Sequence, residues 1–396
     1  MLKRKEFGMA IAKAVENNME KASWIRRMFE YGHEMKKKYG EKNVFDLTLG
    51  NPMVEPPPAF KKRLVEAVAS DEKGMHRYMP NTGYETTRKA VAESLDGDWS
   101  IGLESRHVIM TVGAAGALNV AVKALVDPED EIMIMAPYFP EYRFYANNHR
   151  AKERIIETTS DFQLDIDEIK NNLNSRTKII ILNSPNNPTG VIYPKKAYED
   201  LAQCLDEHEK ETGRAVYIIS DEPYRKIVYG NKRAPSPMEV CRNTILCTSH
   251  SKDLGIPGER IGYAVVRPGC KEEEKLFNAM AFCNRTLGFV NAPALMQKVV
   301  EGLQNDSIDM EIYRRKKDRL LRALEKAKIR CSQPQGAFYL FPESPEEDDK
   351  EFVKKLAARR VLAVPGSGFG RPGYFRLSFC CDDHTVEGAA QVLETL

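Results

Sequence analysis

The sequence lacks three features that would point to particular classes of protein. No stretch approaches the roughly eighteen consecutive apolar residues that a membrane span requires. The 59 lysines and arginines nearly balance the 57 aspartates and glutamates, and a net charge of +2 offers no support for a nucleic-acid or membrane-surface partner. The eight cysteines include no Cys-x-x-Cys pair, which argues against a zinc site and against a disulfide framework. We therefore expect reduced thiols and no metal.

Several targeting and binding motifs are missing as well. Residues 1–16 mix charged and single apolar residues and lack the apolar core of a secretory signal, so we expect a cytoplasmic protein. The chain has neither the Gly-x-x-x-x-Gly-Lys-Ser/Thr motif of a nucleotide P-loop nor the Gly-x-Ser-x-Gly elbow of a serine hydrolase. The glycines of residues 366–370 do not have the spacing of a dinucleotide-binding loop.

What the chain does contain is an alternation of short apolar runs and amphipathic stretches. Its 396 residues leave room for two or three domains with a large core. The stretches near residues 114–125 and 195–211 have helical spacing of their apolar residues. The apolar runs are typical of buried parallel strands and lie at residues 107–111, 131–135, 177–182, 215–219, 244–247 and 261–266. This alternation predicts an α/β fold whose sheet is covered by helices on both faces.

The character of the sequence changes after Pro293. A long charged helix is expected at residues 307–328, followed by short strands near 337–341 and 374–379. We interpret this part as a smaller α+β domain, to which the N-terminal segment also belongs. The predicted boundaries are 46–300 for the large domain, and 1–45 together with 301–396 for the small domain.

Polar residues follow the ends of five of the predicted strands. Ligands on open parallel sheets bind outside the carboxyl ends of the strands, so we expect these residues to gather at one edge. Each has a structural explanation: Gly113 could let a helix pack closely, Asp221 could cap a helix, and Lys252 could be a solvated lysine. In chain order the residues are Gly113, Ala114 and Ala115, then Phe139, Asn187, Asp221 and Tyr224, and finally Ser249, Ser251 and Lys252.

As a set, these residues match the chemical needs of pyridoxal 5′-phosphate. That cofactor requires a lysine to form a Schiff base and a carboxylate to keep its ring nitrogen protonated. It also requires donors for its phosphate and an aromatic side chain against its ring. The sequence offers a candidate for each requirement.

The same residues carry a resemblance to a known family. From Leu49-Gly50-Asn51-Pro52 to Arg376-Leu377-Ser378-Phe379 the chain resembles the class I and II aminotransferases of fold type I, the aspartate aminotransferase superfamily. The most specific motif is Ser249-His250-Ser251-Lys252 followed by Gly258-Glu259-Arg260-Ile261-Gly262. The resemblance implies a fold type I pyridoxal phosphate-dependent transferase, with a mostly parallel seven-stranded sheet in the large domain.

The resemblance implies roles for individual residues. Lys252 would hold the cofactor as a Schiff base and then shuttle the substrate proton, and Asp221 would pair with the ring nitrogen. Asn187 and Tyr224 would bind the ring oxygen, and Phe139 would stack on the ring. Lys252, Asp221 and Tyr224 form the implied catalytic set. The implied phosphate ligands are Gly113, Ala114, Ala115, Ser249, Ser251 and Arg260.

Further residues are implied to bind the substrate or to link two subunits. Arg376 would hold the substrate α-carboxylate in a bidentate contact, with the backbone amide of Gly50 beside it. Tyr78 matches the tyrosine that reaches the phosphate of the neighbouring subunit, which implies a homodimer. The implied reaction is a two-stage, ping-pong transfer of the amino group of an L-amino acid to a 2-oxo acid, with 2-oxoglutarate as the expected acceptor.

The sequence leaves three questions open. The same scaffold supports carbon-sulfur β-lyases and other α,β-eliminating enzymes, since each reaction begins by labilising the Cα proton. A transcription regulator that uses such a domain as a ligand sensor is disfavoured, because about forty residues precede the cofactor domain. The sequence does not identify the amino donor. A dicarboxylate substrate would need a second cation, for which Arg285 and Arg143 are the candidates.

Overall fold

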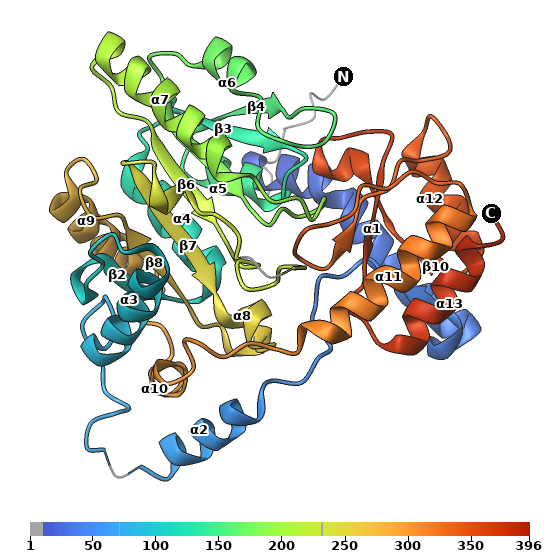
Figure 1. The fold of residues 1–396 in the computed structure, drawn as a ribbon, viewed down its shortest axis with the longest axis horizontal. Helices are drawn as coiled ribbons and strands as arrows, with labels where there is room; N and C mark the ends of the chain where they lie inside the picture. The colour runs from blue at the N-terminus through green and yellow to red at the C-terminus, as the bar shows by residue number, and fades with distance from the viewer. Residues whose placement is uncertain (1–10, 71, 231–232) are drawn as a thin grey trace, which may run out of the picture.

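The chain folds into two lobes that meet at one edge of a large sheet (Figure 1). The computed structural model describes residues 11–70, 72–230 and 233–396, and the side chains of residues 20–30 are not described. Helices α11, α12 and α13 gather in one lobe, and the large sheet with its covering helices forms the other. No helix in the described ranges is both long and apolar enough to cross a membrane.

The large lobe contains the predicted seven-stranded, mostly parallel sheet. Its strand order is β2-β8-β7-β6-β5-β3-β4. The strands are β2 (Val108–Thr111), β3 (Glu131–Ala136), β4 (Lys152–Glu157), β5 (Thr177–Asn183), β6 (Tyr217–Asp221), β7 (Thr244–Ser249) and β8 (Gly262–Val266). All except β8 run in the same direction, so their carboxyl ends share one edge.

Two strands differ from the sequence prediction. The run at 261–266 was predicted as a parallel strand, whereas β8 is antiparallel to both β7 and β2. Only the four-residue helix α8 (His250–Asp253) and a short 3-10 turn separate β7 from β8, and parallel pairing would need a longer crossover. The edge strand β4 has no counterpart among the predicted runs, because its sequence Lys-Glu-Arg-Ile-Ile-Glu is largely exposed and lacks a continuous apolar run.

Helices cover both faces of the sheet because successive residues of its strands point to opposite sides. Ile132 and Ile134 belong to a core shared with Leu118 of α4, whereas Met133 and Met135 belong to a core shared with Leu201 of α7. The first face carries α4 (Gly113–Leu125), α5 (Glu141–Asn148) and α9 (Glu273–Thr286), and the second carries α6 (Ile166–Asn172) and α7 (Lys195–Thr212). A further core near β2 and β8 includes α3 (Glu85–Trp99) and α10 (Ala294–Glu301).

The small lobe is the predicted α+β unit. Strands β11 (Val364–Pro365), β12 (Phe375–Ser378) and β9 (Tyr339–Leu340) form an antiparallel sheet. Strands β9 and β12 share a core with α11 (Met310–Lys326), α12 (Asp349–Ala358) and α13 (Asp383–Leu393), whereas Val364 of β11 belongs to the core that includes Leu201 of α7. Near the N-terminus, α1 (Lys13–Tyr39) leads to β1 (Phe45–Asp46), which pairs in parallel with β10 (Val361–Leu362). This pairing accords with assigning the N-terminal segment to the small domain, although the boundaries at 46 and 300 stay a prediction.

The remaining elements are helix α2 and five short 3-10 helices. Helix α2 (Pro58–Val68) packs against α10 and precedes the exposed segment that leads to α3. Short 3-10 helices lie at Glu41–Asn43, Ser105–His107, Pro237–Glu239, Pro257–Glu259 and Gly366–Phe369. All eight cysteines are free thiols, and six of them are buried, as expected for core residues.

Candidate active site

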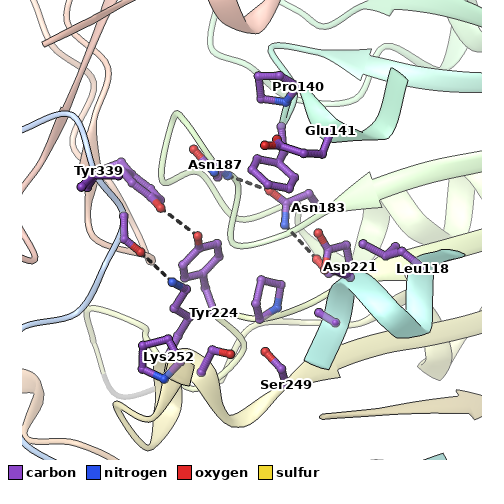
Figure 2. A pocket seen from close by; sticks show the side chains of 18 of the residues that line it. Leu118, Pro140, Glu141, Asn183, Asn187, Asp221, Tyr224, Ser249, Lys252 and Tyr339 are labelled. Carbon is purple, nitrogen blue, oxygen red and sulfur yellow. Dashed lines mark hydrogen bonds between the residues drawn. The ribbon is translucent and has the colours of Figure 1, made fainter. Parts of the chain in front are cut away.

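A cavity of about 360 Å³ opens at the carboxyl edge of the sheet, where the two lobes meet. Its size is typical of a small-molecule site. Residues at the carboxyl ends of β2, β3, β5, β6 and β7 line it together with residues of the small lobe (Figure 2). Of the residues predicted from the sequence, it includes Gly50, Ala114, Ala115, Phe139, Asn187, Asp221, Tyr224, Ser249, Ser251, Lys252, Arg260 and Arg376. Gly113 lies immediately behind this lining, and Tyr78 lies outside it.

Hydrogen bonds between neighbouring strand ends shape the cavity floor. The amide of Asn183, the last residue of β5, donates to the carbonyl oxygen of Asp221 at 2.8 Å. Its side-chain oxygen accepts from the backbone N–H of Asn187 at 2.7 Å. Asn183 therefore holds the loop after β5 against the end of β6, which directs Asn187 and Asp221 toward the same space.

Lys252 projects into the cavity from α8, directly after β7. Its Nζ donates a hydrogen bond of 2.6 Å to the carbonyl oxygen of Gly50, a residue of the segment between the lobes. The pKa of the Lys252 amine is lowered to about 8, mainly by burial; Cys380 opposes the shift, and the guanidinium groups of Arg260 and Arg376 contribute to it. About a tenth of the amine is therefore unprotonated at pH 7, and an unprotonated amine is a nucleophile and a base.

Asp221 lies across the cavity from Lys252 (Figure 2). Its Oδ2 accepts a hydrogen bond of 2.5 Å from the hydroxyl of Tyr142 on α5, whereas its Oδ1 is buried without a partner. The pKa of Asp221 is raised to about 7, mainly by burial. The hydrogen bond from Tyr142 opposes this shift, and the charge of Glu222 contributes to it. A buried carboxylate oxygen without a donor is costly, so this oxygen is suited to a ligand that carries a positive N–H group.

A site for an anion lies where α4 begins. Gly113 has a φ of +69°, and a Cβ at this position would lie 2.7 Å from Nη2 of Arg260. Only glycine allows this backbone to approach the guanidinium so closely. The free N–H groups of the first turn of α4, the guanidinium of Arg260 and the hydroxyls of Ser249 and Ser251 together provide donors for a phosphate group.

Arg376 enters the cavity from β12 of the small lobe. Its Nη1 donates to Oδ1 of Asn187 at 2.9 Å and its Nη2 to the carbonyl oxygen of Thr48 at 2.5 Å. The guanidinium also lies 4.7 Å from the ring centroid of Tyr339 and 4.6 Å from that of Phe369. Its Nε is buried without a partner. The guanidinium is thus held in place, and its Nε–H and the second N–H of each terminal nitrogen remain for a carboxylate.

Tyr224 and Gly50 both adjoin Tyr339, which the sequence did not single out. The hydroxyl groups of Tyr224 and Tyr339 lie 2.9 Å apart. A Cβ at Gly50 would come within 2.0 Å of the Tyr339 hydroxyl, so this approach also requires glycine.

Three other predicted residues lie away from the cavity of their own chain. The side chain of Tyr78 is 91% exposed on the segment between α2 and α3. Arg285 is exposed near the end of α9, with its guanidinium over the ring of Phe282. Arg143 is engaged by Glu153 in an ion pair that raises the pKa of its guanidinium. Neither arginine lines the cavity.

Sequence reasoning missed about half of the lining. The lining residue Glu141 and the Asp221 partner Tyr142 lie two and three positions after the predicted ring-stacking residue Phe139, so their position in the chain could have indicated them. No pattern in the sequence indicated Tyr339 or Phe369, because both lie in the small lobe, far from the predicted strand ends of the large sheet. The unpredicted lining residues are Thr48, Leu49, Leu118, Pro140, Glu141, Tyr145, Asn183, Pro223, Pro257, Tyr339, Val364 and Phe369.

Comparison with known proteins identifies the family of the chain. The model of the family "Aminotransferase class I and II" matches residues 42–393. A probable aspartate aminotransferase of Methanocaldococcus jannaschii is 31% identical over 369 residues, covering 89% of this chain and 93% of that protein. An aminotransferase crystal structure from Eubacterium rectale superposes with a TM-score of 0.94 at 35% identity, covering 98% of each chain. The aspartate aminotransferase of Thermus thermophilus with maleate gives a TM-score of 0.85 at 25% identity, covering 98% of this chain and 99% of that one.

These similarities resolve what the sequence left open between group transfer and elimination. They confirm the predicted fold class, the transaminase activity and the dependence on pyridoxal phosphate, with an amino acid and a 2-oxo acid as substrates. The chain belongs to the class I and II aminotransferases and is a pyridoxal phosphate-dependent transaminase of fold type I.

Proposed function

We propose that this cavity holds pyridoxal 5′-phosphate through Lys252 and exchanges an amino group between an L-amino acid and a 2-oxo acid, with 2-oxoglutarate as acceptor. The observation that carries the proposal is the pairing of Lys252 and Asp221 across one cavity. Lys252 offers an amine whose pKa is lowered to about 8, and Asp221 offers a buried carboxylate oxygen without a hydrogen-bond partner.

The residues present fit this cofactor. Ala114, Ala115, Ser249, Ser251 and Arg260 would bind the phosphate, and Gly113 would let the backbone approach Arg260. Phe139 would lie against the ring, and Asn187 and Tyr224 would bind its oxygen. Oδ1 of Asp221 would hold the proton on the ring nitrogen, because that N–H supplies the partner that this buried oxygen lacks.

When bound, the cofactor supplies an aldehyde that condenses with amines and a protonated ring that accepts the electron pair released at the substrate Cα. Asp221 sustains that acceptor because its carboxylate balances the positive charge of the ring. Tyr142 keeps Asp221 ionised and oriented, since its hydrogen bond favours the charged carboxylate.

Lys252 performs the proton transfer in this proposal. Its Nζ would take the proton that leaves the substrate Cα and would deliver it to C4′, the former aldehyde carbon of the cofactor. The lowered pKa of the amine suits this role, because a base with a pKa near the working pH can both accept and release a proton.

Arg376 orients the substrate. Its guanidinium is already fixed by Asn187 and Thr48 and lies between two aromatic rings, so little conformational freedom is lost when a carboxylate binds. Nε and the outer edge of the fork would hold the α-carboxylate. The backbone amide of Gly50 would donate from the opposite side.

We also propose that two copies of the chain complete two sites. Tyr78 is 91% exposed although it is aromatic, and it lies on an exposed segment that projects beyond α2. A tyrosine in this position would reach the phosphate of the neighbouring subunit, which makes the active enzyme a homodimer.

A half-reaction tests the function directly. Purified enzyme loaded with pyridoxal phosphate is mixed with one L-amino acid in the absence of a 2-oxo acid. We expect the cofactor absorbance to change, with one equivalent of 2-oxo acid released per site, and to return when 2-oxoglutarate is added. Continuous release of ammonia without an added 2-oxo acid would instead indicate an eliminating enzyme.

A further inference from the structure

Five charged side chains line the cavity among those that the structure describes. They are Glu141, Asp221, Lys252, Arg260 and Arg376. Four of them have partners in the proposed function: the ring nitrogen, the aldehyde, the phosphate and the α-carboxylate. Glu141 is the charge that remains unassigned, and the described lining contains no further cation beyond the three already used.

Glu141 is placed to face the substrate. It is the first residue of α5, two positions after the ring-stacking Phe139, and it stands on the Asn187 side of the cavity, opposite Lys252 (Figure 2). Its Oε2 is buried without a hydrogen-bond partner. Glu141 forms none of the ion pairs within 4.0 Å that occur among the described side chains.

The surroundings of this carboxylate leave it short of positive charge. Burial raises the pKa of Glu141, and its own backbone N–H and the more distant charge of Arg376 oppose that change. Once a substrate α-carboxylate occupies Arg376, the positive charge that Glu141 senses is neutralised. A buried acceptor in this state needs a donor from the ligand.

The variable part of an amino acid substrate is its side chain, and that side chain is the group available to meet Glu141. A terminal ammonium or guanidinium would supply both the missing donor and the opposite charge. A terminal carboxylate would place two like charges together in a partly buried site without a nearby free cation.

We propose that Glu141 determines side-chain specificity and selects an amino donor whose side chain ends in a cation, such as a basic or diamino L-amino acid. This inference rests on the proposed function, because it requires Arg376 to hold the α-carboxylate. 2-Oxoglutarate, the acceptor expected from the sequence, carries a distal carboxylate, so its KM falls when the charge of Glu141 is removed.

Three acids with the same five-carbon chain test the inference on holoenzyme whose Schiff base has been reduced with borohydride, so that the amine of 5-aminopentanoate cannot condense with the cofactor. Pentanoate, 5-aminopentanoate and glutarate share one carboxylate for Arg376 and differ at the far end, which is neutral, cationic or anionic. Their dissociation constants are measured by titration calorimetry for the wild type, Glu141→Gln and Glu141→Asp. Glu199→Gln removes the same charge from an exposed position on α7 and serves as the control.

We expect the wild type to bind 5-aminopentanoate about tenfold or more tightly than glutarate. Glu141→Gln should remove most of that preference, because 5-aminopentanoate should bind more weakly and glutarate more tightly. The dissociation constant of pentanoate should change by about twofold at most. Glu141→Asp should keep the direction of the preference, and Glu199→Gln should leave all three constants unchanged.

Two results would overturn the inference while leaving transamination in place. One is that Glu141→Gln weakens the binding of all three acids equally, which would mean that Glu141 only positions Arg376 or stabilises the start of α5. The other is a wild-type preference for glutarate that Glu141→Gln does not alter. Failure of all three acids to bind would reject the role of Arg376 as well, and the half-reaction described above then decides separately whether the enzyme transaminates.

Discussion

The hydroxyl of Tyr142 donates a hydrogen bond of 2.5 Å to Oδ2 of Asp221 and leaves Oδ1 buried without a partner. This arrangement orients the carboxylate from α5, an element on one face of the sheet, beside the cavity that Asp221 lines. Tyr142 is therefore a positioning residue for the group that we assign to the ring nitrogen.

Tyr142→Phe should slow the single-turnover half-reaction by about tenfold, because losing a hydrogen bond to a charged group costs roughly 1.5 to 3 kcal/mol. The pKa of Asp221 should rise further, and the pH profile of the half-reaction should shift to higher pH. Tyr193→Phe removes another buried tyrosine hydroxyl away from the cavity and is the control. An unchanged pH profile in Tyr142→Phe would reject this positioning role.

Lys252→Ala should bind pyridoxal phosphate without the absorbance of a covalently held cofactor and should have no half-reaction. The fold should persist, because the Lys252 side chain contributes one hydrogen bond, to Gly50, and lines a cavity rather than a packed core. Absorbance spectra and circular dichroism measure the two properties. Lys195→Ala, at an exposed position at the start of α7, should behave as the wild type, and retained absorbance in Lys252→Ala would identify a different anchoring lysine.

The rate at which apoenzyme captures pyridoxal phosphate should depend on the pKa of Lys252. The unprotonated amine is the nucleophile, so the rate should rise about tenfold per pH unit at low pH and level off near the pKa. Burial lowers that pKa to about 8 from an ordinary 10.5, and the plateau should therefore begin near pH 8. A stopped-flow pH series measures it, and a rate that continues to rise to pH 10 would contradict the lowered pKa.

Asp221→Asn should retain the cofactor but slow the half-reaction by about a hundredfold or more, since a neutral amide does not balance a protonated ring. The same variant should stabilise the apoenzyme at higher pH. Folding raises the pKa of Asp221 from 3.8 to about 7, so the wild type loses stability as the pH rises between these values and no further above them. The gain in melting temperature should therefore be small near pH 4 and complete above about pH 7. A gain that is equal at both pH values would contradict the raised pKa.

Arg376→Lys should raise the KM for both the amino acid and the 2-oxo acid by roughly 10- to 100-fold, because an ammonium cannot reproduce the fork that binds a carboxylate. The cofactor absorbance should stay unchanged, since Arg376 is assigned to the substrate. Arg371→Lys, at an arginine that pairs with Glu157 outside the cavity, is the matched control. Loss of cofactor binding in Arg376→Lys would indicate that the arginine supports the cofactor instead.

The residues that follow the strands of the large sheet could be predicted because they depend on short-range patterns. Apolar runs identified β2, β3, β5, β6 and β7, and parallel strands place their carboxyl ends at one edge. Asn187, Asp221, Ser249 and Lys252 therefore had to lie near one another wherever the sheet formed. The family resemblance added Arg376 and Gly50, which no strand-end argument could have placed.

The direction of β8 and the presence of β4 could not be predicted in the same way. Both an antiparallel and a parallel strand can be a continuous apolar run when both faces are buried, so the sequence of β8 does not reveal its direction. Strand β4 lies at the sheet edge and is largely exposed. Because its sequence contains several charged residues, it has no continuous apolar run that would predict a strand.

The amino-acid sequence by itself determined the α/β class, the order of the strands along the chain and the chemical types available for the reaction, because local periodicity and residue identity are properties of neighbouring positions. Only the tertiary structure decided that Tyr142 binds Asp221, that Tyr339 and Phe369 enclose Arg376, and that Glu141 faces the substrate without a partner. Most of those contacts join segments far apart in the chain, and their geometry follows from how the two lobes pack around a shared cavity.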